Sequence, residues 1–281
     1  MHGETHVYYG NFGRVAALRP GNNLVPHAHR EAHIVIQVSG PTALAMVGEQ
    51  TVLMSGGTGV AINPLTVHSF QLLGTAGSGV LLTFYINPDW LKQHCGLSTT
   101  VPFQSARICL NEGMKDTAQS LVDAIELGNT LDDTIGIEIG LFLESLISLA
   151  IRPDGVEWHA AERLRPDYRV RKAMVFMEQN LDARCTLEQV ARSAGLSRPH
   201  FFSLFHEQTI LTPRIYWNLL RIENAITQIR QAEGQLGTVA YNLGFTSPGN
   251  FSRFFREHIG VSPMSFRRAV RQTDFSYTFE E

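Results

Sequence analysis

GTVAYNLGFTSPGNFSRFFR, at residues 237–256, predicts two short helices joined by a tight turn. Gly244 permits the left-handed backbone that ends a first helix. Ser247 can then cap a second helix, with Pro248 at the first helical position. Three aromatic residues follow at helical spacing and predict a buried face: Phe251, Phe254 and Phe255. A packed face opposite a polar face is what a helix-turn-helix needs in order to enter a major groove.

The same pattern occurs once more, 49 residues upstream. The match pairs seven residues of each copy: Leu187, Val190, Ala191, Gly195, Leu196, Phe202 and Phe205 with Leu236, Val239, Ala240, Gly244, Phe245, Phe251 and Phe254. A repeat that covers both turn and core positions predicts two copies of one structural unit. Thr212-Pro213 opens a long predicted helix between the copies, which extends to about Arg230.

Polar residues outside the predicted buried stripes are the candidates for contact with DNA. They are Arg198, His200 and Ser203 in the first unit, and Ser247, Asn250, Arg253 and Arg256 in the second. Arg and Asn side chains can form paired hydrogen bonds to guanine and adenine edges. Each of these residues suits a phosphate contact or a solvated surface equally well, so the sequence leaves base readout open.

Length and composition set the class of protein. A chain of 281 residues favours two domains, and 44% hydrophobic with 17% charged residues is typical of a globular protein. The chain has neither an apolar run of about 18 residues nor a signal-peptide pattern, which predicts a cytoplasmic protein. The three scattered cysteines have no CxxC spacing, which argues against a disulfide framework or a thiolate metal site. We find no serine-hydrolase elbow, phosphate loop or dinucleotide fingerprint.

Charge divides the chain into two halves. Residues 1–165 carry a formal net charge of −6, whereas residues 166–272 carry +6. A basic half beside an acidic half suits a polyanion-binding module attached to a module of another kind. A basic surface that binds nothing would carry the same net charge. The charge difference therefore supports a DNA-binding half only together with the helix-turn-helix repeat.

Short apolar runs separated by turn residues fill the region from residue 7 to about residue 86. The predicted strands are residues 15–18, 34–38, 44–47, 59–62 and 80–84. Many short strands at close spacing predict a β-sandwich or barrel.

Four histidines in this region have the spacing of a metal site: His27, His29, His33 and His68. His27 and His29 are two residues apart, so on a strand both imidazoles face the same side. His33 shares their parity, but on a straight strand it would lie about 13 Å from His29. The chain must therefore turn between them for one ion to reach all four. Glu31 is a candidate for a further ligand or for a hydrogen-bond partner of a ligand.

The two helix-turn-helix units, followed by Gly-Val-Ser-Pro at 260–263, resemble the AraC/XylS family of transcription regulators over the last hundred residues. The histidine region resembles the first cupin motif, with His33 where that motif usually has Glu. Residues 57–68 resemble the second motif loosely, with Asn63 and Leu65 replacing its usual Pro and Gly. The cupin resemblance implies a small jelly-roll barrel, which this family commonly uses as its sensor.

The resemblance implies an α+β protein of two domains. We expect a cupin-like sensor barrel at 1–110, a helical dimerisation segment at 111–152, a linker at 153–166, an all-α DNA-binding domain with two helix-turn-helix units at 167–272, and a disordered tail at 273–281. Helices are predicted at about 115–127 and 132–151, and the second has a broad apolar stripe. In this family the matching helices pair two subunits, although such a stripe also suits packing within one domain.

The expected function is sequence-specific regulation of transcription, most often activation in this family, under control of an effector bound in the barrel. The candidate effectors are a divalent transition metal (Zn, Ni, Fe or Cu) and an unidentified organic molecule. The implied partners are double-stranded promoter DNA, RNA polymerase and a second copy of the chain, with no membrane. We expect no enzymatic activity; the alternative is a metal-dependent cupin enzyme fused to a DNA-binding module.

Overall fold

The computed structural model describes residues 5–74, 79–95, 103–127, 133–151, 166–181, 185–231 and 235–274. It divides into two compact units, the first comprising 1–157 with 256–281 and the second comprising 158–255. The second unit thus ends inside the predicted DNA-binding domain. The predicted linker at 153–166 and the predicted tail at 273–281 fall almost entirely outside the described residues, so those boundaries stay predictions.

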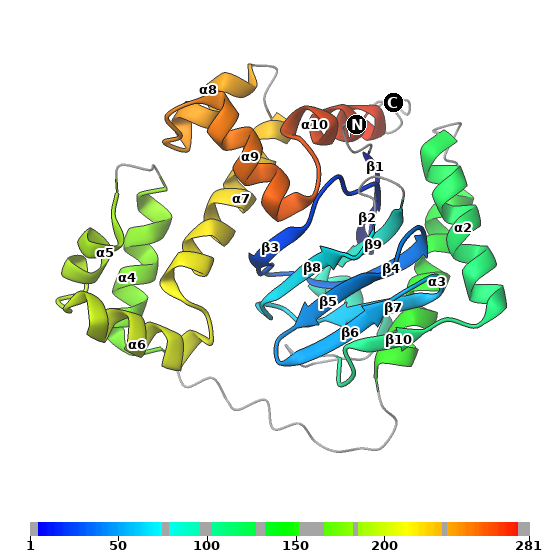
Figure 1. The fold of residues 1–281 in the computed structure, drawn as a ribbon, viewed down its shortest axis with the longest axis horizontal. Helices are drawn as coiled ribbons and strands as arrows, with labels where there is room; N and C mark the ends of the chain where they lie inside the picture. Colours follow the sequence, from blue (N-terminus) through cyan, green and yellow to red (C-terminus); the bar gives the residue numbers. More distant parts are fainter. Residues whose placement is uncertain are drawn as a thin grey trace. The chain divides into compact units, whose positions relative to one another are not determined.

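Two antiparallel sheets form the N-terminal part of the first unit (Figure 1). The six-stranded sheet has the order β1 (Thr5–Gly10), β2 (Gly13–Leu18), β9 (Val80–Ile86), β4 (Ala32–Ser39), β7 (Thr58–Ile62) and β10 (Arg107–Cys109). The four-stranded sheet has the order β3 (Leu24–His27), β8 (His68–Leu72), β5 (Ala43–Val47) and β6 (Gln50–Met54). All five strands predicted from apolar runs are present, which confirms the β-rich N-terminal domain.

The strands of the six-stranded sheet carry different residues on their two faces. In β4, Ile34 and Ile36 belong to the main hydrophobic cluster, whereas His33 alternates with them and is only 2% exposed. In β9, Phe84 belongs to the cluster, whereas Tyr85 stacks on His33 with 5.5 Å between ring centroids. Because side chains alternate along a strand, His33 and Tyr85 lie on the face opposite the hydrophobic cluster.

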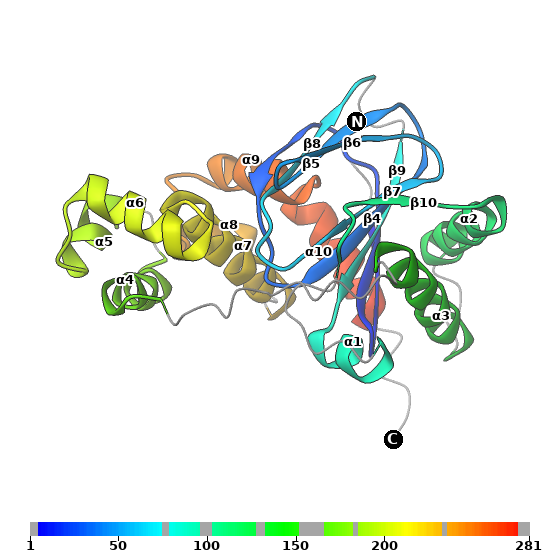
Figure 2. The ribbon, with the colours of Figure 1, turned by 90° about the horizontal axis from the view of Figure 1, so that it is seen from below.

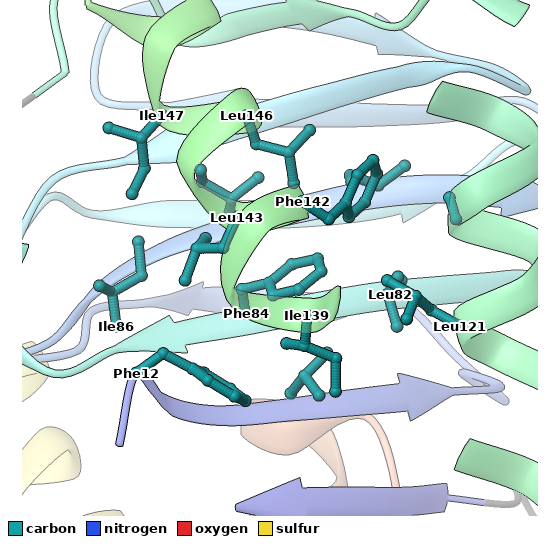
Figure 3. Close-up of a cluster of buried hydrophobic side chains, with 14 of the residues drawn as sticks. Phe12, Leu82, Phe84, Ile86, Leu121, Ile139, Phe142, Leu143, Leu146 and Ile147 are labelled. Carbon is teal, nitrogen blue, oxygen red and sulfur yellow. The ribbon is translucent and has the colours of Figure 1, made fainter. Parts of the chain in front are cut away.

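Helices cover the face that carries the hydrophobic cluster. They are α1 (Pro88–Cys95), α2 (Glu112–Leu127) and α3 (Asp133–Ala150), and Figure 2 shows α2 and α3 on one side of the sheet. Figure 3 shows the side chains of α3 pointing at those of β9, and the rings of Phe142 and Phe84 lie 6.0 Å apart. The apolar stripe of α3 therefore packs largely within its own domain.

The C-terminal half is helical, as predicted. Its helices are α4 (Tyr168–Gln179), α5 (Leu187–Ser193), α6 (Arg198–Thr209), α7 (Pro213–Gln231), α8 (Leu236–Asn242), α9 (Pro248–Ile259) and α10 (Pro263–Asp274). No helix in the described part of the chain is long and apolar enough to cross a membrane. The second unit holds α4 to α8 and most of α9, whereas α10 belongs to the first unit.

The two helix-turn-helix turns have the same backbone geometry. Gly195 and Gly244 both have φ of 71°, a left-handed conformation that favours glycine. In each turn the next residue donates its amide proton to a carbonyl five residues earlier, from Leu196 to Ala191 at 3.0 Å and from Phe245 to Ala240 at 2.9 Å. The repeat seen in the sequence is thus a repeat of structure.

The register of the repeat changes after the turn. The predicted offset of 49 residues holds as far as Phe245, but α6 and α9 correspond at an offset of 50, because the second turn has one more residue. The buried pairs are therefore Phe201 with Phe251 and Phe205 with Phe255, all at most 1% exposed. Phe202 and Phe254, which the sequence placed in the core, are half-buried instead.

Helix α8 begins with a weaker cap than α5. Thr186 and Gln189 form a reciprocal capping box on α5, whereas Gln235 makes no side-chain hydrogen bond at the start of α8. Introducing the capping box with Gln235→Thr and Thr238→Gln should raise the free energy of unfolding by about 1 kcal/mol. Urea unfolding of the full chain measures this change. Thr186→Ala, which breaks the existing box, should lower stability by a similar amount, and equal stability of all three chains would contradict the prediction.

Candidate metal centre and DNA-binding surface

The four candidate histidines come from both sheets. β3 ends at His27 in the four-stranded sheet, and β4 begins one residue before His33 in the six-stranded sheet. The chain crosses between the sheets in the residues from Ala28 to Glu31, which supplies the turn that the spacing required. His68 is the first residue of β8 and pairs with His27 across β3 and β8. All four side chains are between 2% and 7% exposed.

Three of these side chains meet the geometric requirement for a shared ion. One ring nitrogen from each of His27, His29 and His68 lies within 4.8 Å of the others. His33 lies beside this group, with its Nε2 3.2 Å from Nε2 of His68 and its ring 5.0 Å from that of His29. Imidazoles bound to one ion at about 2.1 Å have ring centroids about 4.5–5 Å apart when their bonds are perpendicular or tetrahedral. The observed separations therefore suit a common ion.

The backbone fixes which nitrogen of two histidines can bind a metal. Nδ1 of His27 lies 2.7 Å from the carbonyl oxygen of Val25, and Nδ1 of His68 lies 2.9 Å from that of Thr66. A carbonyl only accepts, so each Nδ1 carries the proton and donates it, leaving the Nε2 lone pair for an ion. This arrangement is the usual support of a histidine ligand.

Burial keeps these imidazoles neutral. It holds the pKa of His27, His29 and His68 well below the ordinary value, and the neighbouring imidazoles lower the three pKa values further. Burial also lowers the pKa of His33 to about 3, although its backbone contact with Glu31 opposes this. A metal binds the neutral imidazole, so no proton has to leave before an ion can bind near neutral pH.

The sequence identified Glu31 as a candidate supporting residue beside the histidines, but not its partners Arg14 and Tyr85. The guanidinium of Arg14 donates two hydrogen bonds to the Glu31 carboxylate, at 2.8 and 3.0 Å, and lies 3.8 Å from the centroid of the Tyr85 ring. The Glu31 carboxylate is thus paired with Arg14, and Arg14 in turn stacks on Tyr85 beside the histidines. These three residues come from distant parts of the chain, and no local pattern in the sequence links them.

Two departures from the second cupin motif have structural explanations. Asn63 donates its side-chain amide to the carbonyl of Phe103 at 2.8 Å and accepts the Phe103 amide at 2.9 Å, so it ties two loops together where the motif has Pro. Leu65 stands where the motif has Gly and has φ of 60°. Its amide donates to the carbonyl of His29 at 2.7 Å, which holds His29 in place.

The candidate DNA contacts of the first unit lie on the exposed side of α6. Arg198, His200 and Ser203 are all exposed. Arg198 already pairs with Glu188 of α5, with 3.0 Å between its Nε and the carboxylate oxygen. Because both partners are about half exposed, this pair is weak and can exchange for a phosphate or a base.

The candidates of the second unit divide by role. Ser247 accepts the amide of Asn250 at 3.2 Å, which confirms it as the cap of α9. The Asn250 side chain donates to the hydroxyl of Thr246 at 2.8 Å. Arg253 is exposed and Arg256 is half-buried. Of the two arginines, Arg253 is therefore the more accessible to DNA.

Comparison with known proteins agrees with this geometry. Residues 190–269 match the family model described as a helix-turn-helix domain, and residues 12–143 match the one described as an AraC-like ligand binding domain. The chain is 24% identical to the probable transcriptional regulator LumQ of Photobacterium leiognathi over 252 residues, which are 87% of this chain and 92% of that protein. It is 25% identical to the transcriptional activator RhaS of Citrobacter koseri, over 86% of this chain and 87% of that protein.

A solved structure shares the fold. The apo form of a single-residue variant of ToxT from Vibrio cholerae superimposes with a TM-score of 0.52 at 12% identity, covering 96% of this chain and 98% of that one. The two family models together account for the barrel and for both helix-turn-helix units. The chain therefore belongs to the AraC/XylS family, as a DNA-binding transcription regulator with an N-terminal ligand-binding domain.

Proposed function

We propose that the ligand of the N-terminal domain is a divalent transition metal held by His27, His29, His33 and His68. The observation that carries this proposal is the convergence of three buried ring nitrogens within 4.8 Å of one another, with His33 in contact with His68. Imidazole nitrogens suit Zn, Cu, Fe and Ni, and the donor set does not choose among them. Metal binding then favours one arrangement of the regulator, which alters its affinity for promoter DNA.

Metal analysis of the untagged full chain tests this proposal. We expect about one transition-metal ion per chain, and none in the double variant His27→Ala, His29→Ala. DNA binding is then compared with and without the ion, using sequences selected by the protein from a random library. An absence of metal from the wild-type chain under loading with each of the four ions would overturn the metal assignment. The four histidines would then be assigned to the binding of an organic effector, which an AraC-like ligand binding domain also suits.

We propose that α6 and α9 read DNA in two adjacent major grooves. Support comes from the matching turns of the two units and from the exposed polar residues on both helices. Two recognition helices about one duplex turn apart would contact two segments of a site of about 15–20 base pairs. The relative RhaS is named a transcriptional activator, which supports activation as the output.

Arg253→Ala tests the assignment of α9. The change should cost about 1–3 kcal/mol of binding and relax sequence preference at one position, because Arg can make two hydrogen bonds to guanine. Binding to a panel of single-base variants of the selected site measures both effects. Arg171→Ala, which removes an exposed cation on α4, is the control and should leave the base preferences unchanged. A uniform loss across the panel would instead assign Arg253 to a phosphate.

We propose that α3 pairs two copies of the chain. Ile137 and Leu141 lie one turn apart on α3 and are 62% and 60% exposed, although the opposite side of α3 is buried against the sheet. The double variant Ile137→Glu, Leu141→Glu should turn a dimer into a monomer in sedimentation velocity. Leu53→Glu is a matched control, since Leu53 on β6 is 54% exposed. A wild-type chain that sediments as a monomer would contradict the proposal.

The regulator does not need a catalytic site, and we propose that the histidines bind a signal and convert no substrate. The alternative of a cupin enzyme requires turnover that persists when DNA binding is removed. Oxygen consumption by the metal-loaded chain with small oxidisable substrates would support that alternative.

A further inference from the structure

A fifth histidine lies beside the proposed metal site. His258 is in the last turn of α9, in the part of the helix that belongs to the first unit, and it is 5% exposed. Its ring centroid lies 6.3 Å from that of His27. Two residues later, Gly260 has φ of 86° and its α-carbon faces the side chains of Leu24 and Pro20, so a Cβ there would meet Leu24 at 3.3 Å. The end of α9 is thus packed against the strand that carries His27.

The following helix is held to the same unit. α10 packs against β1, and the amide of Gly260 donates to the carbonyl of Arg256 at 2.8 Å to close the end of α9. Two features therefore fix the backbone at His258. The end of α9 is closed by a hydrogen bond, and the helix that follows it, α10, packs on β1.

An ion that accepts six ligands would have room for a further ligand beside the four histidines. Fe, Ni and other ions that accept six ligands would keep two positions open after binding four imidazoles. A separation of 6.3 Å between two rings exceeds the distance of about 4.5–5 Å for neighbouring ligands and approaches the distance of about 6.5 Å for opposite ones. The ring of His258 is therefore at a separation from His27 that is compatible with the two rings binding on opposite sides of one ion.

We propose that His258 is a further ligand of this ion and that metal binding thereby fixes the last turn of the second recognition helix. This inference rests on the metal site proposed above. It adds a route by which metal binding at that site would reach the second recognition helix. α9 begins at Pro248 and carries Asn250 and Arg253, so the ion and the candidate DNA contacts lie on one continuous helix. A bound metal would restrain that helix at its C-terminal end, and release of the metal would free it.

The test uses the full chain and compares wild type, His258→Gln and His206→Gln. Gln is the residue that α6 carries at the corresponding position, Gln208, so it suits this place in the helix. His206 is an exposed histidine in the last turn of α6 and serves as the matched control. Affinity for Ni²⁺ and Zn²⁺ is measured by calorimetry, and amide hydrogen exchange is followed with and without the metal.

In the wild type we expect metal to slow exchange in residues 256–261 by about tenfold or more, as the bound state raises local stability. In His258→Gln we expect this slowing to be lost and the affinity for Ni²⁺, which accepts six ligands, to fall by about tenfold, whereas His206→Gln should behave as wild type. Unchanged affinity and unchanged protection in His258→Gln would overturn the inference and leave the metal site intact. A wild-type chain that binds neither ion would overturn both proposals together.

A second variant provides a test that does not depend on whether His258→Gln folds as stably as the wild type. His258→Cys retains a metal-binding side chain, because a thiolate coordinates these ions. With Co²⁺ as the probe, a thiolate-to-metal absorption band should be present in this variant and absent from the wild type. A Co²⁺-loaded His258→Cys chain without that band would show that the side chain does not reach the ion, which would also overturn the inference.

Discussion

His68→Ala is expected to lower the affinity of the full chain for its transition metal by more than about 100-fold. Loss of a residue that only supports a ligand typically costs about 10–100-fold, so a larger loss identifies a ligand itself. His68 has the features of a ligand, because it is buried, its Nδ1 is engaged by the backbone, and its ring lies 4.2 Å from that of His27. Competition calorimetry against a chelator of known affinity measures the change.

The same experiment assigns His33. As a ligand, His33→Ala should cost as much as His68→Ala. A loss of about tenfold would instead make His33 a neighbour that supports the site without binding the ion. The Nε2 atoms of His33 and His68 lie 3.2 Å apart, and a metal-bound Nε2 has no lone pair left to accept a hydrogen bond. His206→Ala removes an exposed histidine on α6 and is the control. Equal affinity of the His68→Ala and wild-type chains would contradict the proposed site.

Arg221→Met is expected to weaken the second helix-turn-helix by about 2–3 kcal/mol and to abolish its contacts with DNA. Arg221 lies on α7, and its guanidinium is 4.2 Å from the centroid of the Phe245 ring and 5.1 Å from that of Phe254. It donates to the carbonyl of Leu243 at 3.0 Å, directly before the turn glycine Gly244. The side chain thus joins α7 to the turn and to the recognition helix.

The charge of Arg221 persists in this position. Burial lowers the pKa of Arg221 to about 10, so the guanidinium remains protonated at neutral pH. Met fills a similar volume but offers neither the hydrogen bond nor the cation, and the Leu243 carbonyl loses that donor. The change should therefore act on α8 and α9 and spare α5 and α6.

Footprinting on a selected site measures this effect. In Arg221→Met the segment contacted by α9 should lose protection, while the segment contacted by α6 keeps it. Lys172→Met is the control, because Lys172 holds the corresponding position in α4 at the 49-residue offset and is exposed. Simultaneous loss of both protected segments would indicate general unfolding, and full protection of both would show that Arg221 does not position α9.

The fold was largely predictable because its strongest signals are local. Gly195 and Gly244 mark both turns, and short apolar runs separated by turn residues mark β4, β7 and β9. β3 and β8 were not predicted, because each is short and contains a histidine of the site in place of a further apolar residue. The offset of 50 residues in the recognition helices was missed, because adjacent phenylalanines at 254 and 255 fit either register until burial distinguishes them.

The candidate site was predictable in its residue types and only partly in its surroundings. Histidine spacing gave the four candidates, and strand length required the turn between His29 and His33. Contacts between distant strands leave no mark in a single sequence, so the support of Arg14 by Glu31 and Tyr85 was missed. His258 was missed for the same reason, since more than two hundred residues separate it from His27.

The two-faced strands of the six-stranded sheet have a consequence for how such regulators acquire new effectors. On β4, Ile34 and Ile36 pack under the helices, whereas Val35 and Gln37 alternate with them on the same face as His33. Substitutions at Val35 and, on β9, Thr83 would therefore change the face of the sheet that carries His33 without disturbing the residues that hold the helices, whereas Gln37 donates to the backbone of the turn that follows β4. Effector specificity can diversify at every second position while the scaffold beneath stays constant, which makes these positions the natural choice for a randomised library.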